Sequence, residues 1–529
     1  MAGFVSRRLK GVTWEPELEE IRRRTELAKE MGGTERVQRQ HDQGRLTVRE
    51  RIDRLCDEGS FHEIGALAGF PTYEGDELVD FSPSNILAGT AHIDGRRVVV
   101  CGDDFSVRGG SADAAIHLKQ IYAERMANEL RLPIVRLIEG SGGGGSVKSY
   151  ESFKRTYVPA NPGWDLVVDN LSKVPVVSAC LGPVAGLGAA RVVMAHFSVM
   201  VKENAQLFVA GPPVVRAGMR QEVTKEELGG WEIHARESGA VDNAAEDEED
   251  AMAQCRRFLT YLPSSVWEAP PRTPATDDPQ RREPELISIV PRERRQVYDM
   301  RRILGSIFDH DSLFEIGRYY GPSLICGLAR LDGYPVAVLA NDPRVYAGGM
   351  TAAAAQKMTR FADLADTFHL PVVNFVDQPG FVIGVDAERA GTIRHGARAM
   401  AAVYQASVPW VSIIVRKVFG VAGAAHGNAQ RLNLRYAWPS GDWGSLPLEG
   451  GIEAAYRRVL EEADDPDAKR REILESLESI RSPFRTAETF GIEEIIDPRE
   501  TRPILCEWVH EAYRIVPTLV GPRTHSIRP

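Results

Sequence analysis

The chain repeats itself at an offset of 238 residues, and this internal duplication restricts the possible folds more than any other feature. The stretch 86–104 reads ILAGTAHIDGRRVVVCGDD, and the stretch 324–342 reads LICGLARLDGYPVAVLAND. The match holds its register through Gly110 and Gly348 and on to Glu139 and Asp377. Chance does not keep register over such a length. The chain therefore consists of two copies of one α/β unit, and each copy should build a related site.

Both copies predict the same order of elements: strand, tight turn, strand, helix and buried strand. Asp94-Gly95 and Asp332-Gly333 are typical two-residue hairpin turns. The buried strands are LPIVRLIEG and LPVVNFVDQPG. Helical spacing gives each helix an apolar face that should be buried. These faces are Leu118, Ile121, Tyr122, Met126 and Leu130 in the first copy, and Met358, Phe361, Leu364, Ala365 and Phe368 in the second.

The pattern predicts an α/β fold of two tandem domains. The first is expected over residues 1–262 and the second over 292–529. The segment 263–291 between them is rich in Pro, Asp, Glu and Arg, which is a linker composition. Residues 15–61 and 467–478 are charged and helical in pattern.

Composition excludes several functions. A net charge of −10 argues against a nucleic-acid partner, and no apolar run is long enough to predict a membrane span. The six cysteines are scattered without a C-x-x-C pair, which favours reduced thiols and a cytoplasmic location. The 12 histidines show no metal-binding spacing, so no metal site is expected.

Glycine-rich stretches follow the predicted strands in both copies. They lie at 139–146 and 182–190, and again at 377–381 and 419–425. A glycine turn from a strand into a helix presents backbone N–H groups that can hold an anion, and for an enolate this is an oxyanion hole. The alternative is that the small residues only allow close packing. Recurrence at the same place in both copies favours a site.

Other polar residues near these loops leave their roles open. Arg416-Lys417 and the run 394–398 are basic clusters that could meet phosphates, although such residues are more often solvated. His395 and His426 lie near the loops of the second copy, where most histidines are structural or face solvent.

The sequence resembles the carboxyltransferase (β) subunit of biotin-dependent acyl-CoA carboxylases, of the propionyl-CoA and methylcrotonoyl-CoA carboxylase type. The resemblance covers nearly the whole chain. The matching motifs are GRLTVRERIDRLCDEGSF (44–61), SVMVKENAQLFVAGPPVVRAGMRQEVTKEELGG (198–230), FVDQPGF (375–381), IRHGA (393–397), VPWVSIIVRKVFG (408–420) and YAWPS (436–440). It implies two crotonase-like domains of the ClpP/crotonase superfamily. It also implies a homohexamer in which each active site lies between the first domain of one subunit and the second domain of another.

The resemblance further implies an activity and its partners. A carboxyl group passes from carboxybiotin to an acyl-CoA enolate, and two oxyanions must be stabilised. The thioester hole would lie at Gly186 and Leu187 with Gly188 adjacent, and the biotin hole at Val421 and Ala422 with Gly420 adjacent. Nothing in the chain resembles a Met-Lys-Met biotinyl sequence or an ATP-grasp carboxylase. Biotin is therefore expected on a partner, the biotin carboxylase or biotin carboxyl carrier subunit, and the coenzyme A thioester is the substrate.

The chain departs from the family at several of these positions. Many members have Gly-Gly where this chain has Gly186-Leu187 and Gly420-Val421, and Leu and Val resist a positive φ. The substrate-binding positions implied by the resemblance are Gly142, Gly143, Gly144, Gly423 and Ala424. The last two stand where a Tyr and a variable residue are common, which predicts a wider acyl pocket. Two alternatives stay open: a biotin-dependent decarboxylase of a malonyl-type CoA, and a non-catalytic structural paralogue.

Overall fold

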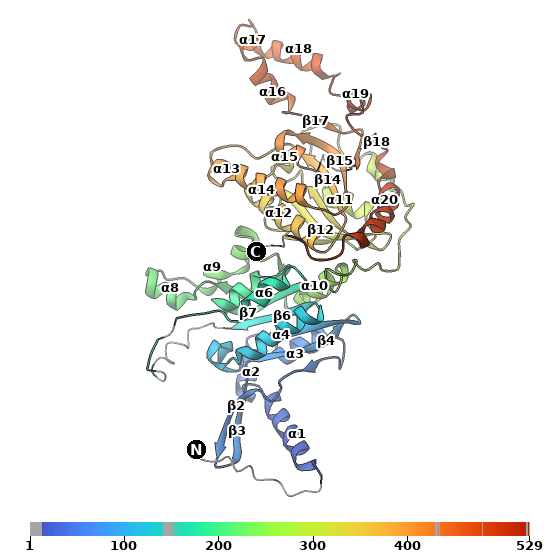
Figure 1. Ribbon diagram of the computed structural model, residues 1–529. Coiled ribbons are helices and arrows are strands. Elements are labelled where there is room, and N and C mark those ends of the chain that lie inside the picture. Colours follow the sequence, from blue (N-terminus) through green and yellow to red (C-terminus); the bar gives the residue numbers. More distant parts are fainter. Residues whose placement is uncertain are drawn as a thin grey trace. The chain divides into compact units, whose positions relative to one another are not determined.

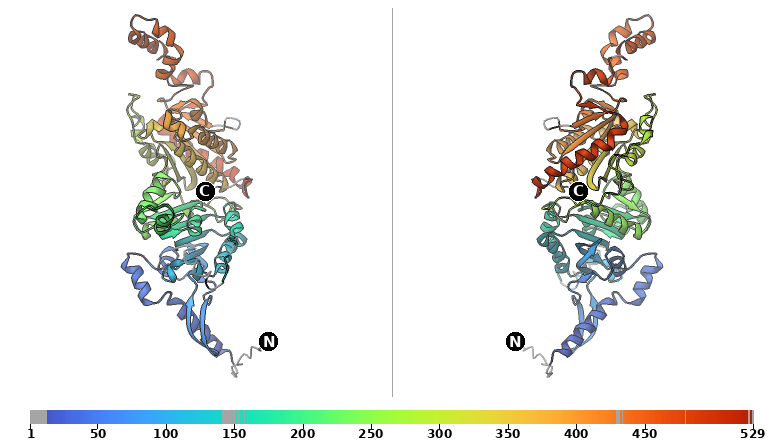
Figure 2. Two further views of the ribbon diagram at one scale, coloured as in Figure 1. Left: turned by 90° about the vertical axis from the view of Figure 1, so that its left-hand side faces the viewer. Right: turned by 90° about the vertical axis from the view of Figure 1, so that its right-hand side faces the viewer.

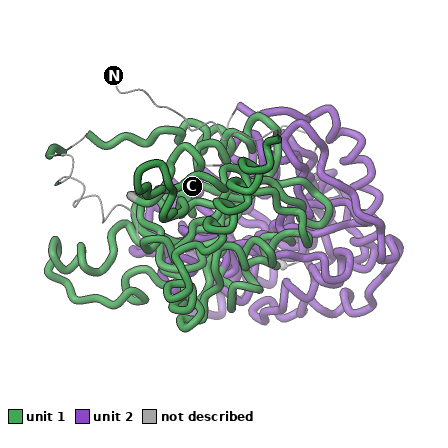
Figure 3. Tube along the Cα trace, turned by 90° about the horizontal axis from the view of Figure 1, so that it is seen from below, with its two compact units in different colours: residues 1–170, 176–231, 244–256 green, residues 171–175, 232–243, 257–529 purple. Residues whose placement is uncertain are grey.

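The chain forms two compact units of similar build (Figure 3). The computed structural model describes residues 13–140, 151, 154–156, 158–428, 432, 434–478, 480–524 and 527. The first unit contains residues 1–170, 176–231 and 244–256, and the second contains 171–175, 232–243 and 257–529. Residues 263–291 therefore belong by contacts to the second unit, and they include the short 3₁₀ helix η5 (Pro284–Ile287). The end of the first domain at residue 262 and the linker over 263–291 therefore stay predictions from the sequence.

A mixed sheet forms the centre of the first unit, in the strand order β1-β4-β5-β6-β7-β8-β10, with β9 paired to the end of β7. Figure 1 labels β4, β6 and β7 of this sheet. β1 and β4 and then β4 and β5 are antiparallel, and β5 to β8 run parallel. The strands are β1 (His62–Glu63), β4 (Ile86–Ile93), β5 (Arg96–Asp103), β6 (Ile134–Gly140), β7 (Val176–Ala185), β8 (Phe197–Val201), β9 (Gln206–Phe208) and β10 (Asn243–Ala245). A separate hairpin joins β2 (Gly69–Glu74) to β3 (Glu77–Pro83). The helices are α1 (Glu15–Lys29), α2 (Thr34–Asp42), α3 (Val48–Leu55), α4 (His117–Leu130), α6 (Trp164–Asn170), α7 (Leu187–Val193), α8 (Pro212–Met219), α9 (Lys225–Gly229) and α10 (Glu248–Tyr261).

The sheet of the second unit has the same topology, in the order β11-β12-β13-β14-β15-β16-β18, with β17 paired to the end of β15. Its strands are β11 (Phe314–Ile316), β12 (Leu324–Leu331), β13 (Tyr334–Asn341), β14 (Val372–Gln378), β15 (Trp410–Phe419), β16 (Leu434–Ala437), β17 (Asp442–Gly444) and β18 (Glu494–Ile495). Its helices are α11 (Met300–Ile307), α12 (Ala352–Thr367), α13 (Val385–Arg389), α14 (Thr392–Gln405), α15 (Gly420–Ala424), α16 (Leu448–Ala455), α17 (Arg457–Glu461), α18 (Pro466–Glu478), α19 (Pro483–Ala487) and α20 (Thr501–Ile515). The predicted duplication and α/β class are confirmed.

Both predicted hairpin turns are present. Asp94 and Gly95 have φ of +50° and +76°, and Asp332 and Gly333 have φ of +48° and +79°. Two successive residues with positive φ match the twist of the antiparallel strands on either side. Each turn is also held by an aspartate outside it: Asp57 accepts from both N–H groups of the first turn and Asp309 from both of the second.

The predicted helix face is confirmed in the second copy, whereas in the first copy three of its five residues are exposed. In the second copy all five predicted residues are buried, four of them in α12 and Phe368 at its C-cap. In α4, Met126 is buried as predicted, but Leu118, Tyr122 and Leu130 are at least half exposed, and Ala123 and Ala127 are buried in their place. The buried face of α4 also carries two charges, because Lys119 pairs with Glu63 and Glu124 with Arg136. Apolar spacing therefore did not locate the buried face of α4, because this face contains charged side chains that are paired with partners from other elements.

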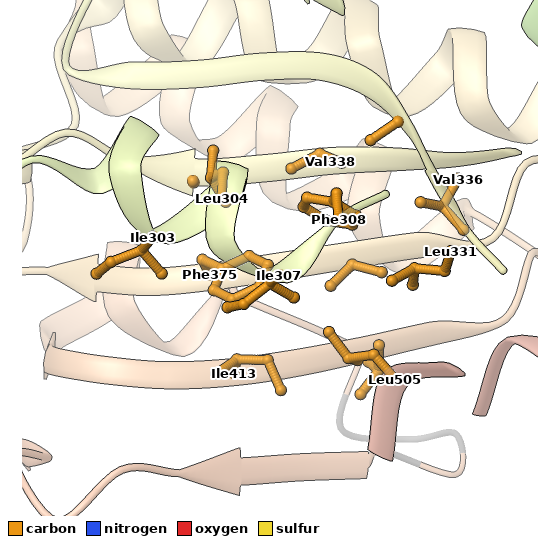
Figure 4. Close-up of a cluster of buried hydrophobic side chains, with 14 of the residues drawn as sticks. Ile303, Leu304, Ile307, Phe308, Leu331, Val336, Val338, Phe375, Ile413 and Leu505 are labelled. Carbon is orange, nitrogen blue, oxygen red and sulfur yellow. The ribbon is translucent and has the colours of Figure 1, made fainter. Parts of the chain in front are cut away.

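The two faces of the second sheet are covered by different helices. Alternate strand residues such as Val338, Phe375 and Ile413 point to one face, where they pack against Ile307 of α11 and Leu505 of α20 (Figure 4). The red helix α20 lies across this sheet in the side views of Figure 2. α12 covers the opposite face. Within the described ranges, every helix is too short or too polar to span a membrane.

Candidate active-site turns

A glycine turn ends β7 in the first unit. Gly186 has φ +62° and ψ −123°, a conformation that residues with a Cβ rarely adopt, and α7 begins at the next residue. The Gly186 N–H donates to the Phe208 carbonyl at 3.1 Å. Gly186 therefore supplies the bend, and its N–H is already used. The N–H groups of Leu187 and Gly188 are the first of α7 and have no acceptor within the helix.

The second unit has the same turn at the end of β15. Gly420 has φ +62° and opens the five-residue helix α15. β17 pairs with the last residues of β15, as β9 pairs with the last residues of β7. Val421 and Ala422 thus occupy the places of Leu187 and Gly188, and their N–H groups lie in the first turn of the helix.

The two departures from the Gly-Gly pattern do not strain these turns. The positive φ falls on Gly186 and Gly420, whereas Leu187 and Val421 have ordinary negative φ. Their side chains are 43% and 57% exposed, so neither is forced into the packed interior of its own unit. The doubt that the sequence raised about backbone geometry is therefore removed.

The wider acyl pocket that the sequence predicts beside the second turn depends on the small residues Gly423 and Ala424, and only one of these two positions is open. Gly423 is buried, and a Cβ there would lie 2.9 Å from the carbonyl carbon of Val418. The missing side chain leaves no open room at this position, because the helix packs directly on β15. Ala424 is exposed, so it alone of the pair can border an open pocket. Gly142, Gly143 and Gly144 lie outside the described residues.

A buried carboxylate lies beside each turn, at the bulge where the neighbouring strand ends. In the first unit this is Glu139, which is 0% exposed and accepts from Gln40, Arg45 and Arg51. Arg51 also pairs with Glu248 at 2.7 Å. Burial alone would lower the pKa of Arg51, but the two carboxylates raise it above its ordinary value. The network explains the motif at 44–61, in which Thr47 and Glu50 also form a capping box that starts α3.

The second unit builds the same arrangement from other residues. Asp377 accepts from Tyr298 Oη at 2.8 Å, from Arg416 Nε at 3.2 Å and from the Lys417 N–H at 3.0 Å. Burial raises the pKa of Tyr298 well above its ordinary value, and the charge of Asp377 adds to this effect. Tyr298 therefore remains a donor. Arg416 is 4% exposed and paired with Asp377, so it is neither solvated nor available to meet phosphate.

The two units place the neutralising cation differently. The residue of the first copy that corresponds to Arg416 is Gly182, and a Cβ there would lie 2.3 Å from Glu139 Oε1. The first unit therefore brings its guanidinium groups from Arg45, which precedes α3, and from Arg51 within α3, and keeps this strand position without a side chain. Sequence reasoning missed both networks, although the recurrence of Glu139 as Asp377 was a signal for them.

A second strained turn contacts each buried acid. Arg108, Gly109 and Gly110 all have positive φ, and so do Tyr346, Ala347 and Gly348. Cβ atoms built on Gly110 and Gly348 would lie 2.6 Å and 2.3 Å from the carbonyl oxygens of Glu139 and Asp377. This close approach explains why a glycine recurs there. Three successive left-handed residues are costly, and such strain is typical of functional sites.

The remaining candidates are dispersed. The His395 ring is 3.2 Å from the Gln356 amide, and the His426 ring is bonded to the Gly423 carbonyl at 2.7 Å. Arg394 and Arg398 are exposed on α14. Among the described residues, no group of three or more His, Cys, Asp or Glu side chains is placed to hold a metal ion. The arrangement therefore offers paired backbone N–H donors in a charge-neutralised setting, which suits stabilisation of an oxyanion.

Comparison with known proteins agrees with this chemistry. Residues 39–513 match the family model described as "Carboxyl transferase domain". The chain is 34% identical to the carboxyltransferase subunit of propionyl-CoA carboxylase from Haloferax mediterranei, over 93% of this chain and 95% of that protein. It is 33% identical to the alpha subunit of methylmalonyl-CoA decarboxylase from Veillonella parvula, over 93% and 94% of the two chains. The hexameric transcarboxylase 12S crystal structure with methylmalonyl-coenzyme A bound has a TM-score of 0.85 at 30% identity, covering 99% of both chains.

The fold and its repeated turns define a tandem crotonase-like α/β protein. The chain belongs to the carboxyl transferase family, and it is a carboxyltransferase subunit of an acyl-CoA carboxylase.

Proposed function

We propose that this chain transfers a carboxyl group from carboxybiotin, carried by a partner subunit, to the α-carbon of an acyl-CoA. The single observation that supports the proposal best is the repeated turn. Gly186 and Gly420 share a φ of +62° at the ends of corresponding strands, each beside a buried and neutralised carboxylate. Two similar reactants, each with an oxygen that becomes negative, call for two similar holes.

The first unit would hold the thioester oxygen of the acyl-CoA. Its donors would be the N–H groups of Leu187 and Gly188, since that of Gly186 is bonded to Phe208. The carboxylate of Glu139 is paired with Arg51 at 2.6 Å and lies 0% exposed. It therefore neither acts as the base nor repels the developing enolate. One preorganised donor of this kind is worth roughly 2.7–4 kcal/mol in the transition state.

The second unit would hold the ureido oxygen of biotin at the N–H groups of Val421 and Ala422. Carboxybiotin would supply the carboxyl group and, once that group has left, the base for the α-proton. Two local features fit such a ligand. Asp377 is neutralised by Arg416. Among the described residues, only the Ser445 carbonyl oxygen, at 3.5 Å, lies within 4 Å of where a Gly420 Cβ would stand. The chain's own task is to bind, orient and stabilise charge.

The alternatives can be weighed against particular observations. Decarboxylation of a malonyl-type CoA is supported by the relative that is the alpha subunit of methylmalonyl-CoA decarboxylase. It would use the same turns in the reverse direction. The non-catalytic paralogue was favoured by the altered Gly-Gly pairs, and that reason no longer applies because both positive φ values fall on glycine.

We further propose a homohexamer, a biotin carboxylase or biotin carboxyl carrier partner, and a cytoplasmic location. Purified alone, the chain should contain no covalent biotin by mass spectrometry and should not hydrolyse ATP. Light scattering should give a hexamer. A stable and catalytically active monomer would contradict the shared active site.

The decisive experiment is reconstitution with a co-purifying biotinylated partner, ATP, bicarbonate and a panel of acyl-CoAs. Leu187→Pro and Val421→Pro each delete one donor in the first turn of a helix, where proline is tolerated. Leu187→Ala and Val421→Ala remove the same side chains but keep the N–H, and they are the matched controls. We expect each proline variant to lose about 10²–10³-fold in kcat and each alanine variant to stay near wild type. Equal activity of the proline and alanine variants would refute the oxyanion assignment.

A further inference from the structure

The short helix α15 ends on an unusual pair of contacts from His426. The carbonyl of Gly423, in the last turn of α15, accepts the backbone N–H of His426 at 3.2 Å and the ring Nδ1–H of the same residue at 2.7 Å. The last carbonyls of a helix have no partner within it, and five residues give few internal hydrogen bonds. The N–H of Ala425, the C-cap of α15, also reaches this carbonyl, and the ring of His426 adds a side-chain donor to these backbone contacts.

The same residue is fastened to the central strands. The carbonyl of His426 accepts from Asn374 Nδ2 at 2.9 Å, from Trp410 Nε1 at 2.9 Å and from Ser412 Oγ at 3.1 Å. Asn374 belongs to β14 and the other two donors to β15, the strands that lead to Asp377 and Gly420. His426 thus links the C-terminal end of α15 to the sheet that carries the turn.

The first unit fastens its helix without a histidine. Arg136 and Ser178, which correspond to Asn374 and Ser412, donate to the carbonyls of Arg191 and Met194 near the end of α7. α7 has seven residues where α15 has five. In the second unit the helix α15 is shorter, and the neutral amide of Asn374 replaces the guanidinium of Arg136. The hydrogen bond from the His426 ring to the Gly423 carbonyl compensates for the helix contacts that Arg136 makes in the first unit.

We propose that His426 is a positioning residue for the second-unit turn, holding α15 so that the N–H groups of Val421 and Ala422 keep their direction. This inference rests on the proposed function of that turn. His426 touches no reacting atom in the proposal; it acts through Gly423. A displacement of about 1 Å at such a donor can cost on the order of 10²-fold in rate.

The protonation state of the ring follows from its contacts. The Gly423 carbonyl only accepts, so Nδ1 carries the proton and Nε2 is the unprotonated nitrogen. Nε2 is buried and has no hydrogen-bond partner among the described residues. Burial lowers the pKa of His426 below its ordinary value; the Gly423 hydrogen bond and Glu493 oppose this shift, and Arg435 adds to it.

The sign of the pH effect is then determined. A second proton would create a buried, charged N–H without an acceptor, which is costly. The folded protein binds this proton less readily than the unfolded chain. The stabilising contact is therefore complete above the ordinary histidine pKa of about 6.5 and is lost as pH falls through the lower folded value.

The test compares three variants of the full chain, assembled with its partner. His426→Leu removes the ring donor, and His426→Asn keeps a donor near the Nδ1 position but cannot titrate. His310→Asn is the control, since His310 is 63% exposed in the same unit. The readouts are kcat and KM for carboxyl transfer between a malonyl-type CoA and free biotin from pH 5.5 to 8.5, the Kd of acyl-CoA, and Tm at both ends of that range.

We expect His426→Leu to lose at least about 10-fold in kcat with the acyl-CoA Kd within twofold of wild type. In the wild type and in His310→Asn, both the rate and Tm should decline at acid pH. His426→Asn should keep most of the rate at higher pH, and its acid decline should be smaller because Asn cannot titrate. A fully active His426→Leu, or an acid decline unchanged in His426→Asn, would overturn the inference. A wild type without any biotin-dependent turnover would refute the proposed function instead, and the pH dependence of Tm would still decide whether the ring holds α15.

Discussion

Replacing Gly186 by alanine tests the turn itself, because the structure separates backbone strain from steric collision there. A Cβ built on Gly186 meets no atom of the described residues within 4 Å, so the substitution adds no clash with them. The conformation at φ +62° and ψ −123° is nevertheless one that alanine adopts only at a cost of about 1–3 kcal/mol. The variant therefore tests the response to backbone strain without an added clash among the described residues.

The protein can respond to this strain in two ways. It can keep the turn and lose about 1–3 kcal/mol of stability, which for a unit of this size lowers Tm by roughly 2–12 °C. It can instead rotate the peptide between Gly186 and Leu187, which sacrifices the hydrogen bond from Ala190 N–H to the Gly186 carbonyl, worth about 0.5–1.5 kcal/mol. Rotation costs no more than strain, so we expect a substantial fraction of molecules to lose the Leu187 donor.

The assay is carboxyl transfer with the reconstituted partner, together with a thermal melt. Gly218→Ala is the matched control, because Gly218 also has nothing within 4 Å of a built Cβ but lies in α8 with a negative φ. We expect Gly186→Ala to lose at least about 10-fold in kcat or several degrees in Tm, and Gly218→Ala to match or slightly exceed wild-type stability. A Gly186→Ala variant with both wild-type rate and wild-type Tm would refute the reasoning.

Three further predictions follow from the buried groups and the pocket. Asp377→Asn should destabilise the protein by about 3–5 kcal/mol, because it leaves the buried Arg416 without a counter-charge. The control Asp386→Asn should change the stability little, since that side chain is 99% exposed. Equal melting temperatures of the two variants would contradict this prediction. All six cysteines are buried, and burial raises the pKa of the thiols of Cys56 and Cys326 to about 12, so the native protein should resist a thiol reagent such as dithionitrobenzoate that labels six thiols after denaturation. Ala424→Ile should shift the kcat/KM optimum toward shorter acyl groups in a series from acetyl- to octanoyl-CoA, by roughly 0.8 kcal/mol per methylene excluded; an unchanged optimum would mean that Ala424 does not border the acyl group.

The periodic features of the chain could be predicted from the residues alone. The repeat is visible because its two copies keep the same register at an offset of 238 residues. The Asp-Gly hairpins, the buried strands and the inward face of α12 depend on neighbours a few positions apart, where spacing determines which side chains share a face. The turns at Gly186 and Gly420 were also located correctly, because a glycine that follows a buried strand in both copies indicates a sharp bend of the backbone at that point.

The inward face of α4 could not be predicted in this way. Lys119 and Glu124 are buried because Glu63 and Arg136 reach them from other strands, and Leu118 and Tyr122 are left exposed. A partner far away in the chain thus reversed the order that hydrophobicity predicts. The same holds for Arg416, whose charge was expected to meet phosphate or solvent and instead neutralises Asp377.

The glycines show most clearly where local information ends. Sequence identifies Gly423 as a missing side chain, but only the packed structure shows that the Val418 backbone occupies the space at this one position. Sequence likewise marks Leu187 and Val421 as departures from a pattern, whereas the fold assigns the positive φ to the glycine before each. Residue types and their spacing define which groups are available. Distances between segments far apart in the chain decide which of those groups are buried, paired or free to act, because burial and charge pairing are properties of the packed neighbours.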